Sequence, residues 1–168
     1  NEVDGDKIIA LFAKHLIQKN NKNSKFPVVT TVMSNLGFEN YLKNKLKINL
    51  KRTQVGDINV INEISKNNSY LGGEQSGHII LPEWSNTGDG ILAAIKITEI
   101  LSKEKTTSST IFNLYASLPQ TKINIPFKKI LNKGVKNINN LKKKYSNPDV
   151  RILIRFSGTE PLIRLLVE

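Results

Sequence analysis

The sequence contains no cysteine among its 168 residues, so disulfides and zinc–thiolate sites are excluded. It also has no apolar run near the roughly 20 residues that a membrane-spanning helix needs. Its first residues lack the basic stretch followed by an apolar stretch that marks a signal peptide. Together these absences favour a cytoplasmic protein without a membrane partner, stabilised by a hydrophobic core.

Acidic residues are scarce, since 14 Asp and Glu face 25 Lys and Arg, a net charge of +11. Residues 1–105 carry 14 basic and 11 acidic residues (+3), and residues 106–168 carry 11 and 3 (+8). A basic region favours an anionic partner such as nucleic acid, a membrane surface or a phosphorylated small molecule. The basic region lacks interleaved aromatic residues and known nucleic-acid-binding motifs, so we expect no nucleic-acid partner.

Helical and strand-like patterns alternate over residues 1–105, which predicts a layered α/β domain. Asp4-Gly5-Asp6 precedes an apolar stripe at helical spacing, and β-branched residues follow at 28–32. Residues 90–101 are almost wholly apolar and predict a helix packed on most of its sides. The polar segment 103–109 is the predicted linker to a second domain.

Residues 110–168 predict a small α+β domain. Strand patterns occupy residues 122–125, 151–155 and 162–167, and an apolar stripe over residues 135–145 predicts a helix. The first domain, residues 1–105, and this second domain have no internal repeat in common.

A glycine-rich polar loop, Gly72–His78, interrupts two apolar runs of the first domain. Glycines allow a tight turn and a close approach of ligand. Glu74 and Ser76 can hydrogen-bond sugar hydroxyls, and His78 can transfer a proton near neutral pH. The same pattern also fits a glycine-rich hairpin with solvated side chains.

A second loop, Ser157-Gly158-Thr159, stands between Arg155 and Arg164. Guanidinium groups match phosphate oxygens in a bidentate manner, and a glycine-containing turn exposes backbone N–H groups. The pattern therefore fits a phosphate-binding loop. It fits equally a simple turn whose arginines face solvent.

Six short motifs show that the chain resembles the α-D-phosphohexomutase superfamily, and within it the bacterial phosphoglucosamine mutases. They occur in family order over nearly the whole chain: Val3–Ile8, Thr31–Phe38, Val55–Asp57, Leu71–Ile80, Thr87–Gly90 and Ser157–Arg164. The resemblance implies the third domain of a four-domain enzyme plus most of the fourth, without its last helix.

The resemblance also implies roles for the two loops. Glu74 and Ser76 would bind the sugar, with His78 near the reacting oxygen. Arg155, Ser157, Gly158, Thr159 and Arg164 would bind the phosphate group that is not being transferred. Two departures stand out, since Ile58-Asn59 replaces the usual Arg-Tyr, and Phe156 replaces a proline.

The activity implied is interconversion of glucosamine 6-phosphate and glucosamine 1-phosphate, which serves amino-sugar and cell-wall precursor (peptidoglycan) synthesis. The reactive phosphoserine and the magnesium ligands of such enzymes would lie in N-terminal domains outside this chain. We therefore expect no metal site within the chain and no activity from it alone. Its partners would be a phosphorylated hexosamine and those N-terminal domains. Alternatives are a phosphomannomutase or phosphoglucomutase fragment, or a non-catalytic sugar-phosphate-binding module.

Overall fold

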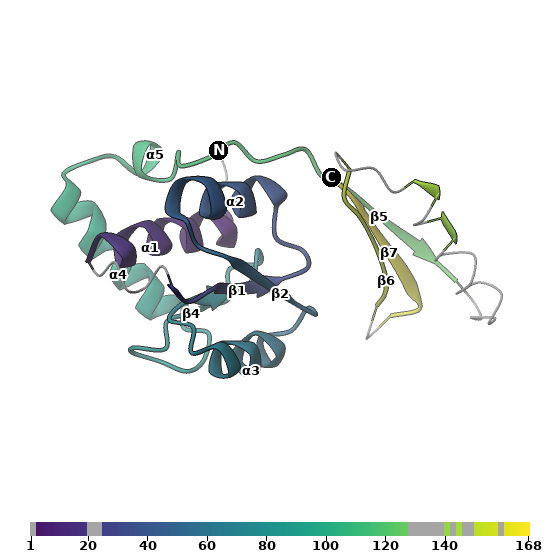
Figure 1. Cartoon of the computed structure of the whole chain (residues 1–168), viewed down its shortest axis with the longest axis horizontal. Coiled ribbons are helices and arrows are strands. Elements are labelled where there is room, and N and C mark those ends of the chain that lie inside the picture. The colour runs from purple at the N-terminus through teal and green to yellow at the C-terminus, as the bar shows by residue number, and fades with distance from the viewer. Residues whose placement is uncertain (1–2, 20–24, 128–139, 142–143, 146–149, 158–159) are drawn as a thin grey trace. The chain divides into compact units, whose positions relative to one another are not determined.

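The structure is a computed structural model that describes residues 3–19, 25–127, 140–141, 144–145, 150–157 and 160–168 (Figure 1). The chain divides into two compact units, residues 1–117 and 118–168. The first is an α/β unit and the second holds a small antiparallel sheet, which confirms the predicted fold class. In the part of the chain described, no helix is long and apolar enough to span a membrane.

The first unit contains all the helices and strands before residue 118. In chain order these are α1 (Gly5–Lys19), β1 (Val28–Thr31), α2 (Leu36–Tyr41), the π-helical turn η2 (Leu42–Leu46), β2 (Leu50–Thr53), α3 (Asp57–Asn67), β3 (Gly72–Gly73), β4 (Ile79–Ile80), α4 (Gly90–Glu104) and α5 (Ser108–Ile111).

The sheet of the first unit has the strand order β2-β1-β3-β4. Strand β1 pairs in parallel with β2, from Val28↔Leu50 to Thr31↔Thr53, and with β3 through Val29↔Gly72. Strand β4 runs antiparallel to β3, with Gly72 opposite Ile80. The carboxyl ends of the three parallel strands therefore share one edge of the sheet.

Helices cover both faces of this sheet (Figure 1). Val28 packs into the larger core, with α1, α2 and α4, whereas Val29 packs with Val60 and Ile64 of α3 on the opposite face. This division follows from the alternation of side chains along a strand. Because both faces are covered, β1 is apolar at both valines and fully buried.

Helix α4 departs from the prediction that it packs on most sides. Within the first unit, Ile91 and Ile95 are 77% and 60% exposed, while Ala93 and Ile100 are buried. The helix thus buries one stripe only. An almost wholly apolar sequence does not reveal which side faces the core, because every face of the helix carries apolar residues.

The segment after α4 belongs to the first unit, so the structure divides the chain later than the linker expected at 103–109. Ile111 is buried in the larger core, and Phe112, Leu114 and Tyr115 pack against it. Lys7 Nζ lies 3.7 Å from the centre of the Tyr115 ring and donates a hydrogen bond to the Tyr115 carbonyl. The polar composition of residues 103–109 therefore reflects an exposed helix end and not a free linker.

The second unit is a three-stranded antiparallel sheet with the order β5-β7-β6. Its strands are β5 (Thr121–Pro126), β6 (Ile152–Phe156) and β7 (Leu162–Val167). Arg155 of β6 lies directly opposite Arg164 of β7. The helix expected over residues 135–145 falls mostly outside the described residues.

Candidate functional site

The first candidate site lies at the carboxyl edge of the parallel strands, where ligands commonly bind in α/β sheets. Loops 32–35, 54–56 and 74–78 follow β1, β2 and β3 at this edge. One hydrogen bond connects two of these loops directly, since Glu74 Oε1 accepts from the Gly56 amide at 2.7 Å. Arg52 of β2 also donates from Nη1 to the Ser34 carbonyl at 2.7 Å.

Residues 74–78 form a tight hairpin loop between β3 and β4. The Glu74 amide donates to the His78 carbonyl at 2.9 Å, and the Gly77 amide donates to the Glu74 carbonyl at 3.0 Å. Gly77 has φ +103°, a left-handed conformation that favours glycine. The hairpin interpretation is thus correct for the backbone.

The polar side chains of this loop gather around Ser76. Its hydroxyl lies 3.3 Å from Glu74 Oε2 and 3.3 Å from His78 Nδ1. Ser76 and His78 are exposed and Glu74 is half-buried. A carboxylate, a hydroxyl and an imidazole therefore lie together on one small surface that a ligand can reach. A simple solvated turn does not require such a grouping.

The first turn of helix α1 packs against this loop. The Gly5 amide donates to the Gln75 carbonyl at 2.9 Å. A Cβ at Gly5 would lie 2.0 Å from the Glu74 carbonyl oxygen, so only glycine permits this contact. Asp4 caps the helix, since its Oδ1 accepts from the Lys7 amide at 3.0 Å, as is typical of an acidic residue at a helix start.

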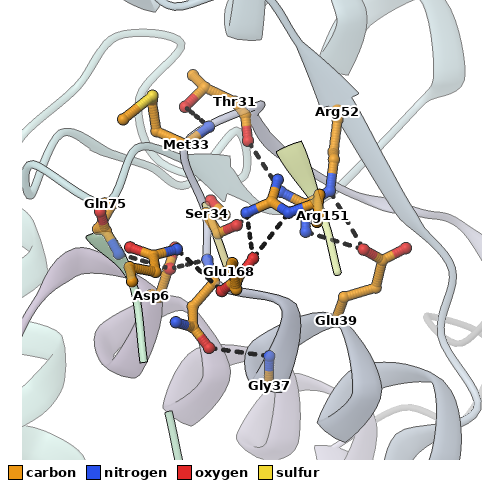
Figure 2. Close-up of polar contacts among 12 residues, drawn as sticks. Asp6, Thr31, Met33, Ser34, Gly37, Glu39, Arg52, Gln75, Arg151 and Glu168 are labelled. Atoms are coloured by element: carbon orange, nitrogen blue, oxygen red, sulfur yellow. Dashed lines mark hydrogen bonds and ion pairs between the residues drawn. The ribbon is translucent and has the colours of Figure 1, made fainter. Parts of the chain in front are cut away.

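Asp6 connects α1 to two of the edge loops (Figure 2). Its Oδ2 accepts from the Asn35 amide at 2.7 Å and from Gln75 Nε2 at 3.4 Å. The side chain is fully buried, and this desolvation raises the pKa of Asp6 to about 6. The hydrogen bond from Asn35 acts in the opposite direction, and burial prevails.

Arg52 fixes the loop that follows β1. Its guanidinium donates to Glu39 Oε2 at 2.8 Å and 3.2 Å and to the Ser34 carbonyl (Figure 2). A guanidinium fork suits this arrangement because its donors diverge in one plane. The motif over residues 31–38 thus has a structural role, since it shapes the edge next to the loop of residues 74–78.

The second candidate site is the β6–β7 hairpin. Residues directly opposite each other in antiparallel strands have side chains on the same face, so Arg155 and Arg164 project together. The Ser157 amide donates to the Leu162 carbonyl at 2.8 Å and closes the loop. Gly158 and Thr159 lie outside the described residues.

Glu160 is a partner that the sequence prediction missed. Arg164 Nη2 lies 2.7 Å from Glu160 Oε2 in an exposed ion pair. Arg164 Nε is buried, without a hydrogen-bond partner in the described part of the chain. The pairing follows from the hairpin, which places Glu160 next to the strand that carries Arg164.

The two departures from the family pattern have clear local environments. Ile58 is 59% exposed at the start of α3 and contributes no charge, while Asn59 Nδ2 donates to the Val55 carbonyl at 3.0 Å. Phe156 packs edge-on against Phe127, with ring centroids 5.9 Å apart.

No group of three or more His, Cys, Asp or Glu side chains that could hold a metal ion occurs in the part of the chain that the structure describes. In particular, Asp6 is buried, and its Oδ2 accepts from the Asn35 backbone amide and from Gln75 Nε2. These residues do not fit a magnesium site.

Comparison with known families shows which family the chain belongs to. Residues 4–118 match the phosphoglucomutase/phosphomannomutase alpha/beta/alpha domain III, and residues 123–168 match the C-terminal domain of the same family. The chain belongs to the phosphohexomutase family. It covers domains III and IV of the phosphohexomutases.

Within this family the chain is similar to phosphoglucosamine mutases. It is 45% identical over 179 residues to that of Fusobacterium nucleatum subsp. nucleatum, covering 100% of this chain and 38% of the relative. It is 43% identical over 173 residues to that of Finegoldia magna, covering 99% of this chain and 38% of the relative. The chain thus spans well under half of these phosphohexomutases.

A solved structure supports the fold. The Aspergillus fumigatus N-acetylphosphoglucosamine mutase, in complex with GlcNAc-6P and magnesium, superposes with a TM-score of 0.75 at 22% identity. The superposition covers 98% of this chain and 43% of the fungal one. The likeness to this fungal enzyme supports the fold over nearly the whole chain.

Proposed function

We propose that this chain is the sugar- and phosphate-binding region of a phosphoglucosamine mutase. The complete enzyme would interconvert glucosamine 6-phosphate and glucosamine 1-phosphate for cell-wall precursor synthesis, in the cytoplasm. The observation that carries the proposal is the carboxylate of Glu74, held at the carboxyl edge of the sheet beside Ser76 and His78. The similarity to phosphoglucosamine mutases over the whole chain supports it.

Glu74 is the residue that suits an amino sugar. The Gly56 amide holds one carboxylate oxygen and the Ser76 hydroxyl lies near the other, so the group is oriented before ligand arrives. Each oxygen retains a further lone pair for the ligand. The amino group of glucosamine is cationic near neutral pH, and a carboxylate binds a cation more strongly than it binds a neutral hydroxyl.

His78 is the proposed proton-transfer residue of this chain. Its ring is exposed, with Nδ1 near the Ser76 hydroxyl. An imidazole can both accept and donate a proton near neutral pH. Ser76 orients the ring, so that Nε2 is left for the sugar oxygen that gains or loses the phosphoryl group.

Arg155 and Arg164 are the proposed ligands of the phosphate that is not transferred, together with Ser157, Gly158 and Thr159. The supporting observation is their shared face of the β6–β7 hairpin. Arg164 exchanges its ion pair with Glu160 for the phosphate, or shares its guanidinium between both anions. Exposed ion pairs contribute about 0.2–1 kcal/mol, less than a charge-assisted bond to phosphate, so this exchange is favourable.

Phosphoryl transfer depends on positioning and on neutralisation of charge. In this proposal the chain supplies positioning, while the phosphoserine and the magnesium ligands belong to domains outside it. When bound, magnesium would stabilise the negative charge of the transferring phosphoryl group. The chain alone is therefore expected to lack mutase activity.

The test is a coupled assay on the complete enzyme and on this chain alone. The complete enzyme should convert glucosamine 6-phosphate at a higher kcat/KM than glucose 6-phosphate or mannose 6-phosphate, and the chain alone should convert none. A preference for mannose or glucose phosphate would assign the enzyme to another branch of the family. Turnover by the purified chain alone, free of host enzyme, would contradict the division of roles.

A further inference from the structure

A separate pocket lies in the first unit, between α1, α4 and the loop after β4. Its volume is about 80 Å³, and its apolar floor consists of Phe12, Leu16, Leu81 and Ile100. None of the residues that line it belongs to the sugar loop or to the β6–β7 hairpin. The pocket is therefore independent of the proposed mutase site.

The rim of this pocket is basic. Lys19, Lys96 and Lys103 line it together with one carboxylate, Glu99, which gives three positive charges and one negative charge, a net charge of +2. Lys103 Nζ lies 2.6 Å and Lys96 Nζ 3.2 Å from Glu99. Hydrogen bonds from Lys103 and Lys96 lower the pKa of Glu99 to about 2, so this carboxylate stays ionised and holds both ammonium groups in place.

Trp84 forms one wall of the pocket. Its side chain is 41% exposed, and Lys96 Nζ lies 4.3 Å from the centre of its ring. An exposed indole beside apolar side chains offers a flat surface on which another ring can pack. The ammonium group of Lys96 is at the same place, so one ligand can contact both.

His15, which also lines the pocket, carries an unsatisfied polar atom. Its Nδ1 is buried and has no hydrogen-bond partner among the residues that the structure describes. Buried polar atoms nearly always have a partner, so His15 Nδ1 can accept or donate a hydrogen bond to a group that enters the pocket. Ion pairing along the surface of α4 accounts for Lys96, Glu99 and Lys103 but not for this atom.

We propose that this pocket binds a small aromatic anion, a single ring that carries one acid group. The ring would pack on the apolar floor and against Trp84, and the acid group would meet Lys96 and the neighbouring ammonium groups. The small volume suits a single ring. The ligand needs both the ring and the acid group, because the apolar floor binds only the ring and the ammonium groups bind only the acid.

Trp84 is the only tryptophan of the chain, so its fluorescence reports on the pocket directly. The experiment titrates the chain with benzoate at constant ionic strength. Benzamide, which has the ring without the charge, and acetate, which has the charge without a ring, are the comparisons. We expect a saturable change in Trp84 fluorescence with benzoate, and binding at least about tenfold weaker for each comparison compound.

A charge variant tests the rim. Lys96→Gln should weaken benzoate binding about fivefold, because one partly exposed charge contact is lost. Lys66→Gln, at the end of α3, is the matched control and should leave affinity unchanged. Chemical shifts of the His15 ring in NMR give a second readout that does not depend on how Lys96 alters Trp84 emission.

Three results would each contradict binding of an aromatic anion in this pocket. The proposal is overturned if benzoate does not saturate, if benzamide or acetate binds as well as benzoate, or if Lys96→Gln and Lys66→Gln bind benzoate alike. Should Lys96→Gln fail to fold, as judged by circular dichroism, Lys103→Gln replaces it. The comparison of the three compounds on the unmodified chain remains decisive in either case.

Discussion

At the scale of single residues, the loop of residues 74–78, which we propose binds the sugar, depends on groups packed against it. Glu74 is oriented by the backbone of Gly56, and the loop rests on Gly5 and on the buried carboxyl of Asp6. A loop held in this way keeps its polar side chains in place before ligand binds, which lowers the entropic cost of binding.

Asp6 gives this region a specific pH dependence. Burial raises its pKa from 3.8 to about 6, so the folded state binds a proton more tightly than the unfolded state. The contribution of Asp6 to the free energy of unfolding is therefore most favourable below pH 4. This contribution falls as the pH rises from about 4 to 6. The fall is on the order of 2–3 kcal/mol in the free energy of unfolding.

Asp6→Asn should remove this fall, because the amide does not titrate and its oxygen can still accept from Asn35. Urea unfolding followed by Trp84 fluorescence between pH 4 and 7 measures the difference. Asp57→Asn, at the exposed start of α3, is the control and should keep the dependence of the parent chain. An unchanged slope in Asp6→Asn would show that another group is responsible.

The two loops were the part of the site that the sequence could indicate. Glu74, Ser76 and His78 stood together in seven residues, and geometry brings their side chains around one hydroxyl. The contacts of Gly56 with Glu74 and of Asn35 with Asp6 could not be predicted, because they join residues 18 and 29 positions apart in the sequence. Only the parallel pairing of β1, β2 and β3 brings these segments to one edge.

At the scale of elements, the fit between α1 and the β3–β4 hairpin is the critical contact. Gly5→Ala would place a methyl group 2.0 Å from the Glu74 carbonyl oxygen. Relieving this clash requires the backbone to move, which destabilises the fold. We expect a loss of about 1–3 kcal/mol in unfolding free energy, as for other overpacked sites.

The matched control for Gly5→Ala is Gly90→Ala at the start of α4. A Cβ there meets no atom within 4 Å, and alanine is a better helix former than glycine. Gly90→Ala should therefore be as stable as the parent chain or more so, in the same urea assay. Equal stability of the two variants would mean that the hairpin moves away from α1 at no cost.

The exposed stripe of α4 and the position of α5 show where sequence patterns were insufficient. An apolar helix has no polar face to mark its solvent side, so the exposure of Ile91 and Ile95 could not be read from composition. Residues 103–109 are polar enough for a linker, yet the apolar residues just beyond them bury Ile111 in the first unit. Tertiary packing, not local polarity, set that boundary.

At the scale of the whole molecule, the division after residue 117 predicts where the chain is most easily cut. Tyr115 is held by Lys7 and by contact with the Tyr41 ring, with centroids 5.8 Å apart, and β5 begins at Thr121. Brief digestion with a protease of broad specificity, followed by mass spectrometry, should therefore cut first within residues 116–120. First cleavage within 103–109 would instead support the linker position that the sequence suggested.

The proposed division of roles, in which one loop binds the sugar and the other binds the phosphate, is best tested with two variants of the complete enzyme. The measurement is kcat/KM for glucosamine 6-phosphate and for glucose 6-phosphate in Glu74→Ala and Arg155→Ala. Charge-assisted hydrogen bonds contribute roughly 1.5–3 kcal/mol, so Arg155→Ala should lower both values about tenfold to a few hundredfold while keeping their ratio. Glu74→Ala should instead lower the ratio itself, because it removes the carboxylate that distinguishes an amino group from a hydroxyl. A ratio unchanged in Glu74→Ala, or kinetics unchanged in a folded Arg155→Ala, would contradict this account.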